Sequence, residues 1–309
     1  MIKYVIKRLI TGVIAMSFLV LLTFIMVHKM PGNPFDTGNV SDQMLELMEE
    51  EYGMNEPIEE QYRLYVRKLM RGDLGESIKK PGTTVRSIIE RSFPITLRLG
   101  IYAFLISLVL GGLVGVWQIL TKNSGIRKMI LVFQSLGVGI PNFAYALLLM
   151  LLFGVYLKWF PIAGIGTASN YVLPVASLAL YPICVISRMI YSIVEGEFEQ
   201  GYVKFLEAKG LKKSVILTKH MWRPVLAKLL VYLGQLLVYL MTGCFVVENI
   251  FTIPGLGREI VSSINNRDYT VIMGLTIFIG IIVIVIQMIL DMIQMYLDPR
   301  IRFGMEQGI

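Results

Sequence analysis

The sequence predicts an all-α integral membrane protein with six transmembrane helices. Of its 309 residues, 55% are hydrophobic and only 17% are charged, and the mean hydropathy is +0.65. These values are too apolar for an ordinary soluble domain of this length. The charged residues also cluster, which leaves several apolar windows of about 20 residues, the length that crosses a hydrocarbon core. Lipid is therefore the expected solvent for much of the chain.

Six apolar segments supply the spans. They lie near residues 9–28, 99–120, 130–157, 172–194, 225–247 and 271–296. The first follows Lys3, Lys7 and Arg8 and so competes with a secretory signal, but its apolar run is long and no small-x-small cleavage site follows it. We expect it to remain as an anchor. Because backbone groups in lipid must be bonded within the chain, each span is predicted to be helical.

Basic residues in the short loops predict the orientation of the spans. Lysine and arginine gather at the N-terminus, near residues 122–128 and in the loop 195–228, whereas the alternate short loops carry only Lys158, Arg258 and Arg267. By the positive-inside rule, both termini and the loop 195–228 are expected in the cytoplasm. The net charge of +7 is then mainly a topology signal, and nucleic acid is not an expected partner.

The long segment from residue 30 to residue 94 is expected outside, since translocated segments of this length largely escape the rule. Asn55 and Pro57 can open a helix there. We expect its apolar face to rest on the membrane surface or on a partner, and that face comprises Ile58, Tyr62, Tyr65, Val66 and Leu69. The chain thus divides into residues 1–95, an anchor with an external segment, and residues 96–309, a core with five spans.

Glycine and proline mark two features of the spans. Gly111 and Gly115 form a small-xxx-small pattern, which predicts close helix contact. Gly137, Gly139 and Pro141 are predicted to kink or interrupt the third span. Broken helices often line translocation paths, but a kink absorbed by neighbouring helices is an equally open alternative. On the first alternative, the polar side chains expected to line a pathway are Gln134, Asn142, Tyr145, Gln235 and Tyr239.

The loop 195–228 has helical periodicity of its own. One face is apolar and is extended by a lysine stem, comprising Tyr202, Phe205, Leu206 and Lys209. The helix is expected to stop at Gly210, a residue type suited to a left-handed cap, and Ser214 to cap a second short helix. Two short helices joined at a glycine form a knob suited to docking in a groove of a cytoplasmic protein. The alternative is a solvated basic loop held by anionic lipid.

The same loop resembles a known family. Residues 202–203 (YV), 208–211 (AKGL), His220 and Arg223 are similar to the coupling-loop motif of binding-protein-dependent ABC importer permeases, in its peptide and nickel (oligopeptide and dipeptide) form. Further stretches resemble this family in order along nearly the whole chain. They are residues 4–8 (YVIKR), 30–34 (MPGNP), 71–75 (RGDLG), 247–251 (VENIF), 254–258 (PGLGR), 266–269 (NRDY) and 298–302 (DPRIR).

The resemblance implies a type I ABC importer permease fold with a cytoplasmic coupling helix, in a prokaryotic cell membrane. Such a chain forms half of a translocation pathway for peptides, nickel or another small solute delivered by an extracytoplasmic binding protein. The implied partners are a second homologous permease and two ATPase subunits, which bind ATP and magnesium in place of this chain. The residues expected to couple to the ATPase are Tyr202, Val203, Leu206, Glu207, Ala208, Lys209, Gly210 and Leu211.

The chain departs from the family pattern at several positions of the loop. Gly201 stands where an acidic residue is usual, Phe205 and Leu206 replace small residues, and Pro224 replaces asparagine. The docking surface is therefore expected to be tuned to its own ATPase. Glu207 lies only three residues before the glycine, so it is not equated with the glutamate of the Glu-Ala-Ala signature of other ABC importers.

The sequence argues against an enzyme. It contains no Gly-x-x-x-x-Gly-Lys-[Ser/Thr] phosphate loop, so ATP hydrolysis is expected on another polypeptide. His-Glu-x-x-His and Gly-x-Ser-x-Gly are also absent, and Cys184 and Cys244 lie in apolar stretches that indicate no metal site. The remaining alternative is an ion-coupled secondary carrier. Carriers usually place ionisable groups in mid-membrane, whereas Glu248 and Asp291 lie near span ends.

Overall fold

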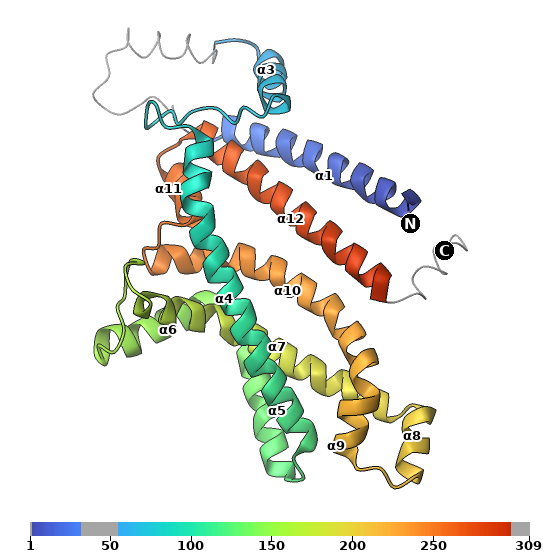
Figure 1. Cartoon of the computed structure of the whole chain (residues 1–309). Helices are drawn as coiled ribbons and strands as arrows, with labels where there is room; N and C mark the ends of the chain where they lie inside the picture. Colours follow the sequence, from blue (N-terminus) through green and yellow to red (C-terminus); the bar gives the residue numbers. More distant parts are fainter. Residues whose placement is uncertain (1, 32–54, 298–309) are drawn as a thin grey trace. The chain divides into compact units, whose positions relative to one another are not determined.

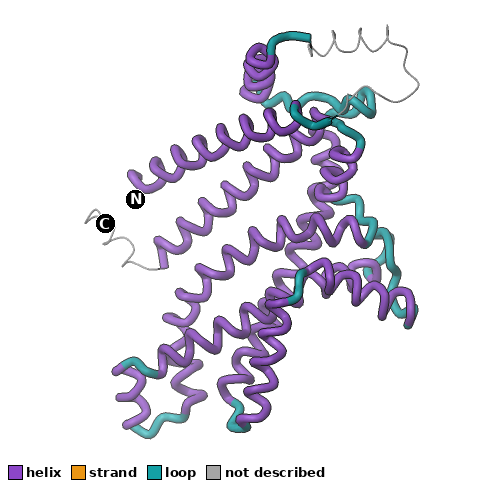
Figure 2. Tube along the Cα trace, turned by 180° about the vertical axis from the view of Figure 1, so that it is seen from behind, coloured by secondary structure: helices purple, strands orange, loops and turns teal. Residues whose placement is uncertain are grey.

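The computed structural model describes residues 2–31 and 55–297, and the regular structure within these ranges is helical (Figures 1 and 2). A single antiparallel bridge, between Glu76 and Thr84, is the one β-type pairing in this part of the chain. The prediction of an all-α protein is confirmed. Of the stretches that resemble the importer permeases, residues 32–34 and 298–302 lie outside the described ranges.

Among the described helices, five are long and apolar enough to cross a membrane. They are α1 (Ile2–His28), α4 (Val85–Leu120), α7 (Ser169–Phe198), α10 (Trp222–Ile250) and α12 (Tyr269–Leu297). A sixth candidate is a bent pair, α5 (Ser124–Gly139) followed by α6 (Asn142–Leu149) and the π-helical η1 (Met150–Tyr156). The shorter helices are α3 (Ile58–Met70), α8 (Gly201–Ala208), α9 (Lys213–Val215), η2 (Ile216–Met221) and α11 (Leu256–Asn265).

The third predicted span is broken where the sequence indicates. The chain bends by 102° between residues 124–139 and residues 142–156. Ile140 has extended backbone angles, φ −91° and ψ 128°, and Pro141 then stands directly before α6. Pro141 contributes to the break, because the proline ring disfavours helical angles in the residue that precedes it, but a proline alone does not suffice. Pro94, Pro174 and Pro182, by contrast, lie inside unbroken helices.

Gly111 and Gly115 bring α4 and α7 into close contact, as predicted. A Cβ added to Gly111 would lie 2.9 Å from the Cβ of Ile186, and one added to Gly115 would lie 3.0 Å from the Cβ of Ile190. Both positions are also 3.0 Å from a backbone oxygen of α7. A larger residue at either glycine would therefore push the two helices apart.

The described residues form two compact units. One comprises the residues up to 95 together with 254–285, and the other comprises 96–253 together with the residues from 286 onward. Residues 254–285, which the sequence division assigns to the permease core, thus pack with the N-terminal part. The candidate coupling and pathway residues all belong to the second unit.

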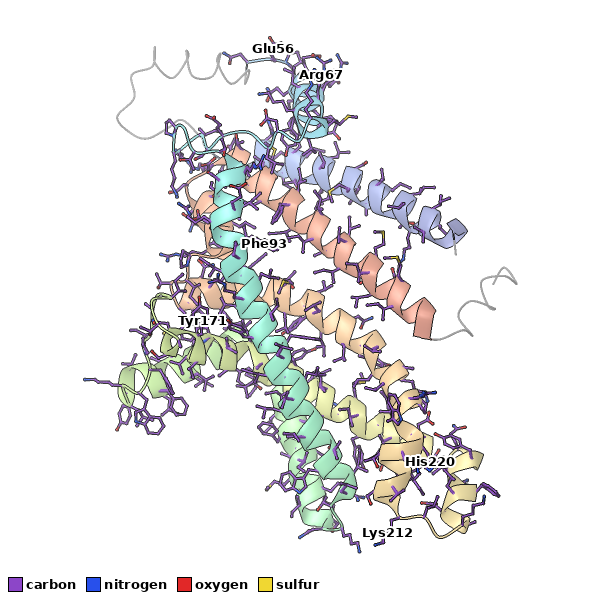
Figure 3. The ribbon with its side chains drawn as sticks, viewed as in Figure 1. Glu56, Arg67, Phe93, Tyr171, Lys212 and His220 are labelled. Atoms are coloured by element: carbon purple, nitrogen blue, oxygen red, sulfur yellow. The ribbon has the colours of Figure 1, made fainter. Side chains whose placement is uncertain are left out.

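In the first unit, α3 packs on α1. Tyr62 and Tyr65 contact Phe24, with ring centroids 5.2 and 6.2 Å away, and His28 Nε2 is 2.9 Å from Gln61 Oε1. The predicted apolar face is largely confirmed, since all its members except Ile58 are half-buried. That face rests on the chain's own first span rather than only on membrane or a partner. Arg67, on this helix, is labelled in Figure 3.

Asp268 fastens residues 77–79 to the start of α12. Its buried carboxylate accepts a hydrogen bond from the Ser77 hydroxyl and one of 3.1 Å from the Ile78 amide. The same carboxylate accepts from the amide of Val271, 3.4 Å away, in the first turn of α12. One side chain therefore caps a span and holds a loop that lies 190 residues earlier in the sequence.

The core of the second unit extends to the loop between α7 and α10. Its buried members are Ile186, Ile190, Val194, Val203, Ile216, Leu217, Met221, Val225, Leu229, Leu233 and Leu236. They come from α7, α8, η2 and α10. Because Val203 of α8 belongs to this cluster and is fully buried, the short helix is packed onto the two long ones.

Candidate coupling site

The predicted end of α8 at Gly210 is a Schellman motif. Gly210 has a φ of +79°, the left-handed conformation that glycine adopts without strain. Its amide donates to the Glu207 carbonyl over 2.9 Å, and the Leu211 amide donates to the Leu206 carbonyl over 3.4 Å. Leu206 and Leu211 also pack against the core cluster of the second unit, which is the apolar contact typical of this cap. The prediction for Gly210 is confirmed.

The predicted apolar face of α8 is divided between two sides. Leu206 faces the protein and packs beside the buried Val203. Tyr202 and Phe205 are 43% and 59% exposed, and Lys209 Nζ lies 4.5 Å from the centroid of the Phe205 ring. The helical spacing of these residues is as predicted, but only Leu206 packs inward, beside Val203. The outward side carries an aromatic and cationic surface.

The segment after Gly210 is not a separate helix. α9, η2 and α10 follow one another without a gap from Lys213 to Ile250. The helix starts before Ser214, since the Lys212 carbonyl accepts hydrogen bonds from the amides of Val215 and Ile216. The Ser214 carbonyl accepts a hydrogen bond from the Thr218 hydroxyl within the helix. The prediction of a Ser214 cap was wrong. The second half of the knob, where Figure 3 labels Lys212 and His220, is thus continuous with a span.

Glu197, near the end of α7, is a buried carboxylate that the sequence analysis did not identify. It is only 4% exposed. Its Oε1 accepts from Lys228 Nζ of α10 over 2.5 Å, and its Oε2 accepts from the Tyr202 hydroxyl of α8 over 2.7 Å. Partial burial and the neighbouring carboxylate raise the pKa of Tyr202 to about 12, so the phenol stays protonated and donates. No spacing rule relates residues 197, 202 and 228.

The remaining predicted coupling residues complete the outward side. Glu207, Ala208, Lys209 and Gly210 are exposed, and Leu211 is half-buried. The eight predicted residues therefore divide into two groups. Val203, Leu206 and Leu211 pack α8 on the spans, whereas the other five, like Phe205, are exposed, and their role in coupling stays a prediction.

Two of the predicted pathway residues lie together. The side chain of Asn142, at the start of α6, interacts with that of Tyr239 on α10. Tyr181 of α7 joins them, with its ring centroid 4.7 Å from that of Tyr239. Asn142 Oδ1 is buried and has no hydrogen-bond partner within the described part of the chain. The broken span thus delivers a polar side chain to an aromatic pair formed by two continuous helices.

The other three pathway candidates have different surroundings. Gln134 is fully buried, and its Nε2 donates to Gln118 Oε1 over 2.7 Å and to Ser187 Oγ over 3.0 Å. Tyr145 donates across the break to the Leu136 carbonyl over 3.2 Å, so it braces α6 against α5. Gln235 is exposed one turn before Tyr239. A role for these three in a pathway stays a prediction.

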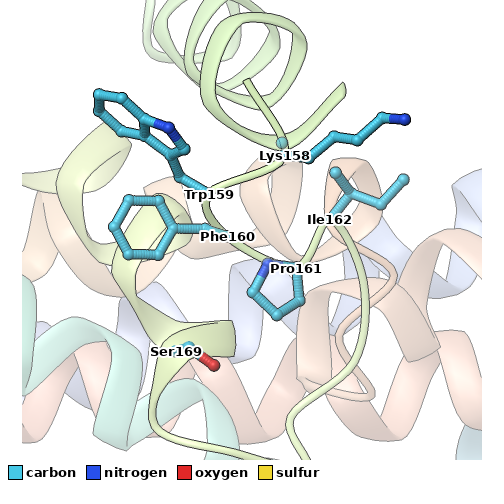
Figure 4. Close-up of a pocket in the computed structure, with 7 residues that line it drawn as sticks. Lys158, Trp159, Phe160, Pro161, Ile162 and Ser169 are labelled. Carbon is cyan, nitrogen blue, oxygen red and sulfur yellow. The ribbon is translucent and has the colours of Figure 1, made fainter. Parts of the chain in front are cut away.

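A shallow pocket lies at the other end of the broken span. It has a volume of about 460 Å³ and is lined mainly by the connection between η1 and α7, including Lys158, Trp159, Phe160, Pro161 and Ile162 (Figure 4). Lys158 adopts a φ of +56°, which is uncommon for a residue with a Cβ. None of the predicted pathway residues lines this pocket.

Comparison with known proteins assigns the family. The family model described as "Binding-protein-dependent transport system inner membrane component" matches residues 93–303. A second, described as "Binding-prot-dependent transport system membrane comp, N-term", matches residues 1–100. Together they span nearly the whole chain.

Individual relatives agree with this match. The oligopeptide transport system permease protein OppB of Haemophilus influenzae is 35% identical, covering 98% of this chain and 100% of the relative. The dipeptide transport system permease protein DppB of Bacillus subtilis is 37% identical, with 98% of each chain covered. A chain of the inward facing MetNI methionine ABC transporter has a similar fold, with a TM-score of 0.59 at 18% identity over 68% of this chain and 96% of that one. The chain belongs to the family of binding-protein-dependent transport system inner membrane components and is a multi-pass membrane permease of the ABC importer type.

Proposed function

We propose that this permease forms half of the translocation pathway of a peptide importer. The observation that carries the proposal is the knob formed by α8 and the start of the α9–α10 rod. Its inner side is packed on two spans, while Phe205 and Lys209 are left exposed. An exposed aromatic and cationic surface on a fixed helix suits insertion into a groove of a partner. The partner is an ATPase subunit.

The proposed complex has a second homologous permease, two ATPase subunits and an extracytoplasmic binding protein. ATP and magnesium bind to the ATPase subunits and not to this chain, whose sequence lacks a phosphate loop. The distribution of lysine and arginine supports an orientation with both termini and the knob in the cytoplasm. α3 and the segment fastened by Asp268 then face the binding protein.

Peptide is the proposed cargo because relatives that match over nearly the full length are oligopeptide and dipeptide permeases. The group formed by Asn142, Tyr181 and Tyr239 is chemically suited to it. Amide and phenol groups can both donate and accept hydrogen bonds, and a peptide backbone presents both kinds of partner. The unpaired Oδ1 of Asn142 is an acceptor that a substrate N–H can satisfy.

Reconstitution tests the proposal and separates it from an ion-coupled carrier. The whole complex is placed in liposomes with its binding protein and a labelled peptide. We expect uptake to require ATP on the ATPase side and to persist when an ionophore collapses the ion gradients. The purified chain alone should hydrolyse no ATP above background. Uptake that follows an ion gradient without ATP would show that the chain is a carrier.

A further inference from the structure

Glu197 holds together three elements that a coupling mechanism must join. It lies on α7, accepts from Lys228 on α10 over 2.5 Å and accepts from Tyr202 on α8 over 2.7 Å. With 4% of its surface exposed, it is the buried member of the group, whereas the side chain of Lys228 is 53% exposed. Each carboxylate oxygen thus accepts a hydrogen bond from a different helix, Oε1 from α10 and Oε2 from α8.

Apolar contacts alone would hold α8 less specifically. Val203, Leu206 and Leu211 pack on the spans through side chains that tolerate sliding, because dispersion and burial have little directional preference. Hydrogen bonds to a charged carboxylate are short and directional. The Glu197 group therefore adds to the apolar layer directional contacts that tie α8 to α7 and α7 to α10.

The same two spans carry the aromatic pair of the candidate pathway. Tyr181 belongs to α7 and Tyr239 to α10, and their rings lie 4.7 Å apart by centroid distance. Glu197 therefore links α8 directly to one of the two helices that place these rings and, through Lys228, links that helix to the other.

We infer that Glu197, with Lys228 and Tyr202, is a positioning group that transmits movement of α8 to the spans α7 and α10. This inference rests on the proposed function, because it presumes that an ATPase subunit docks on α8. Glu197 itself touches neither ATP nor substrate. Its removal should uncouple the two activities rather than prevent docking, since Phe205 and Lys209 on the outward side are unchanged.

The test uses the assembled complex, purified through a tag on the ATPase subunit. Three quantities are measured for each variant: the amount of permease recovered, peptide transport per recovered complex, and the ratio of ATPase activity with and without loaded binding protein. For Glu197→Gln and for Lys228→Gln we expect normal recovery with that ratio lowered by roughly 5-fold or more, the lower end of typical coupling effects. Transport per complex should fall with it.

Two further variants make the result specific. Lys228→Arg keeps a cationic donor beside Glu197 and leaves the Tyr202 hydrogen bond in place, so it should retain at least half of the ratio that Lys228→Gln loses. Glu199→Gln removes an exposed carboxylate two residues away and should match the wild type. A purely structural role would lower recovery while leaving the ratio per complex unchanged, and this outcome would overturn the inference.

Normal ratios in both glutamine variants, or a loss in Lys228→Arg as large as that in Lys228→Gln, would equally overturn it. Failure of the proposed function is recognised separately. In that case the wild-type chain itself would recover no ATPase subunit, or the wild-type complex would show no stimulation by loaded binding protein.

Discussion

Replacing Gly210 by valine tests whether the knob couples the permease to its ATPase. A Cβ at this position meets no atom within 4 Å, so we expect the change to act mainly through backbone conformation. At φ +79° a residue with a Cβ loses about 1–2 kcal/mol, and a β-branched side chain is a particularly poor fit. If the backbone escapes to negative φ, the cap loses two hydrogen bonds worth about 0.5–1.5 kcal/mol each.

Because the backbone takes the less costly of the two routes, the native knob is disfavoured by about 1–2 kcal/mol, a factor of about 5–30 in its population. We expect the variant to insert at normal levels, because the spans satisfy their own backbone hydrogen bonds. Peptide transport and recovery of the ATPase subunit should fall several-fold. Membrane abundance, co-purification with the ATPase subunit and transport are measured on the same preparations.

Gly201 provides a matched control. It too is exposed, a Cβ there also meets no atom within 4 Å, and its φ lies outside the left-handed region. Gly201→Val should therefore behave like the wild type, since valine is no worse than glycine in a helix. If Gly210→Val transports normally and retains its ATPase subunit, or if both valine variants fail alike, the capped knob is not the coupling element.

Three further predictions concern topology, the pathway and the external segment. A cysteine replacing Glu60 should react with an impermeant thiol reagent in intact cells, whereas one replacing Lys212 should react only after permeabilisation; the reverse pattern would refute the orientation. Asn142→Cys should react with a small water-soluble thiol reagent and be protected by peptide delivery, while the buried Gln134→Cys should stay inert; equal inertness would favour a simple kink. Asp268→Ala removes a carboxylate that accepts hydrogen bonds from residues 77–78 and from α12, so it should destabilise this region by at least about 2 kcal/mol. Residues 77–80 should then become accessible to protease added outside, and unchanged proteolysis would contradict the fastening role.

Local signals in the sequence were sufficient for several elements of the fold. Apolar windows predicted the spans, Pro141 predicted the break in the third one, and the position of Gly210 predicted a left-handed cap. Each of these depends on the conformational preferences of a few adjacent residues, or on whether about 20 residues are apolar enough for lipid. The Gly111 and Gly115 pattern is similar, because removing two Cβ atoms on one helix face permits close approach whatever helix arrives there.

The coupling residues could be nominated from the sequence through their resemblance to the importer permeases, but their division into two sides could not. Periodicity placed Phe205 and Leu206 on one apolar face, whereas the structure exposes the first and packs the second. An apolar residue at helical spacing can face either the core or a docking partner, and only the position of α7 and α10 decides between them. Ser214 likewise has the side chain of a cap but lies within a helix that continues into α10.

The sequence by itself therefore determined the class of protein, the spans and the place of the knob, because these follow from local hydrophobicity, charge and turn chemistry. The tertiary structure alone decided which polar groups meet. Glu197 accepts hydrogen bonds from residues 5 and 31 positions away, and Asp268 accepts one from an amide 190 positions away. The buried side chain of Gln134 donates to Gln118 and Ser187 and does not face an open surface. A buried polar group must find a partner wherever packing places one, and the distance along the chain to that partner follows no period that a sequence can display.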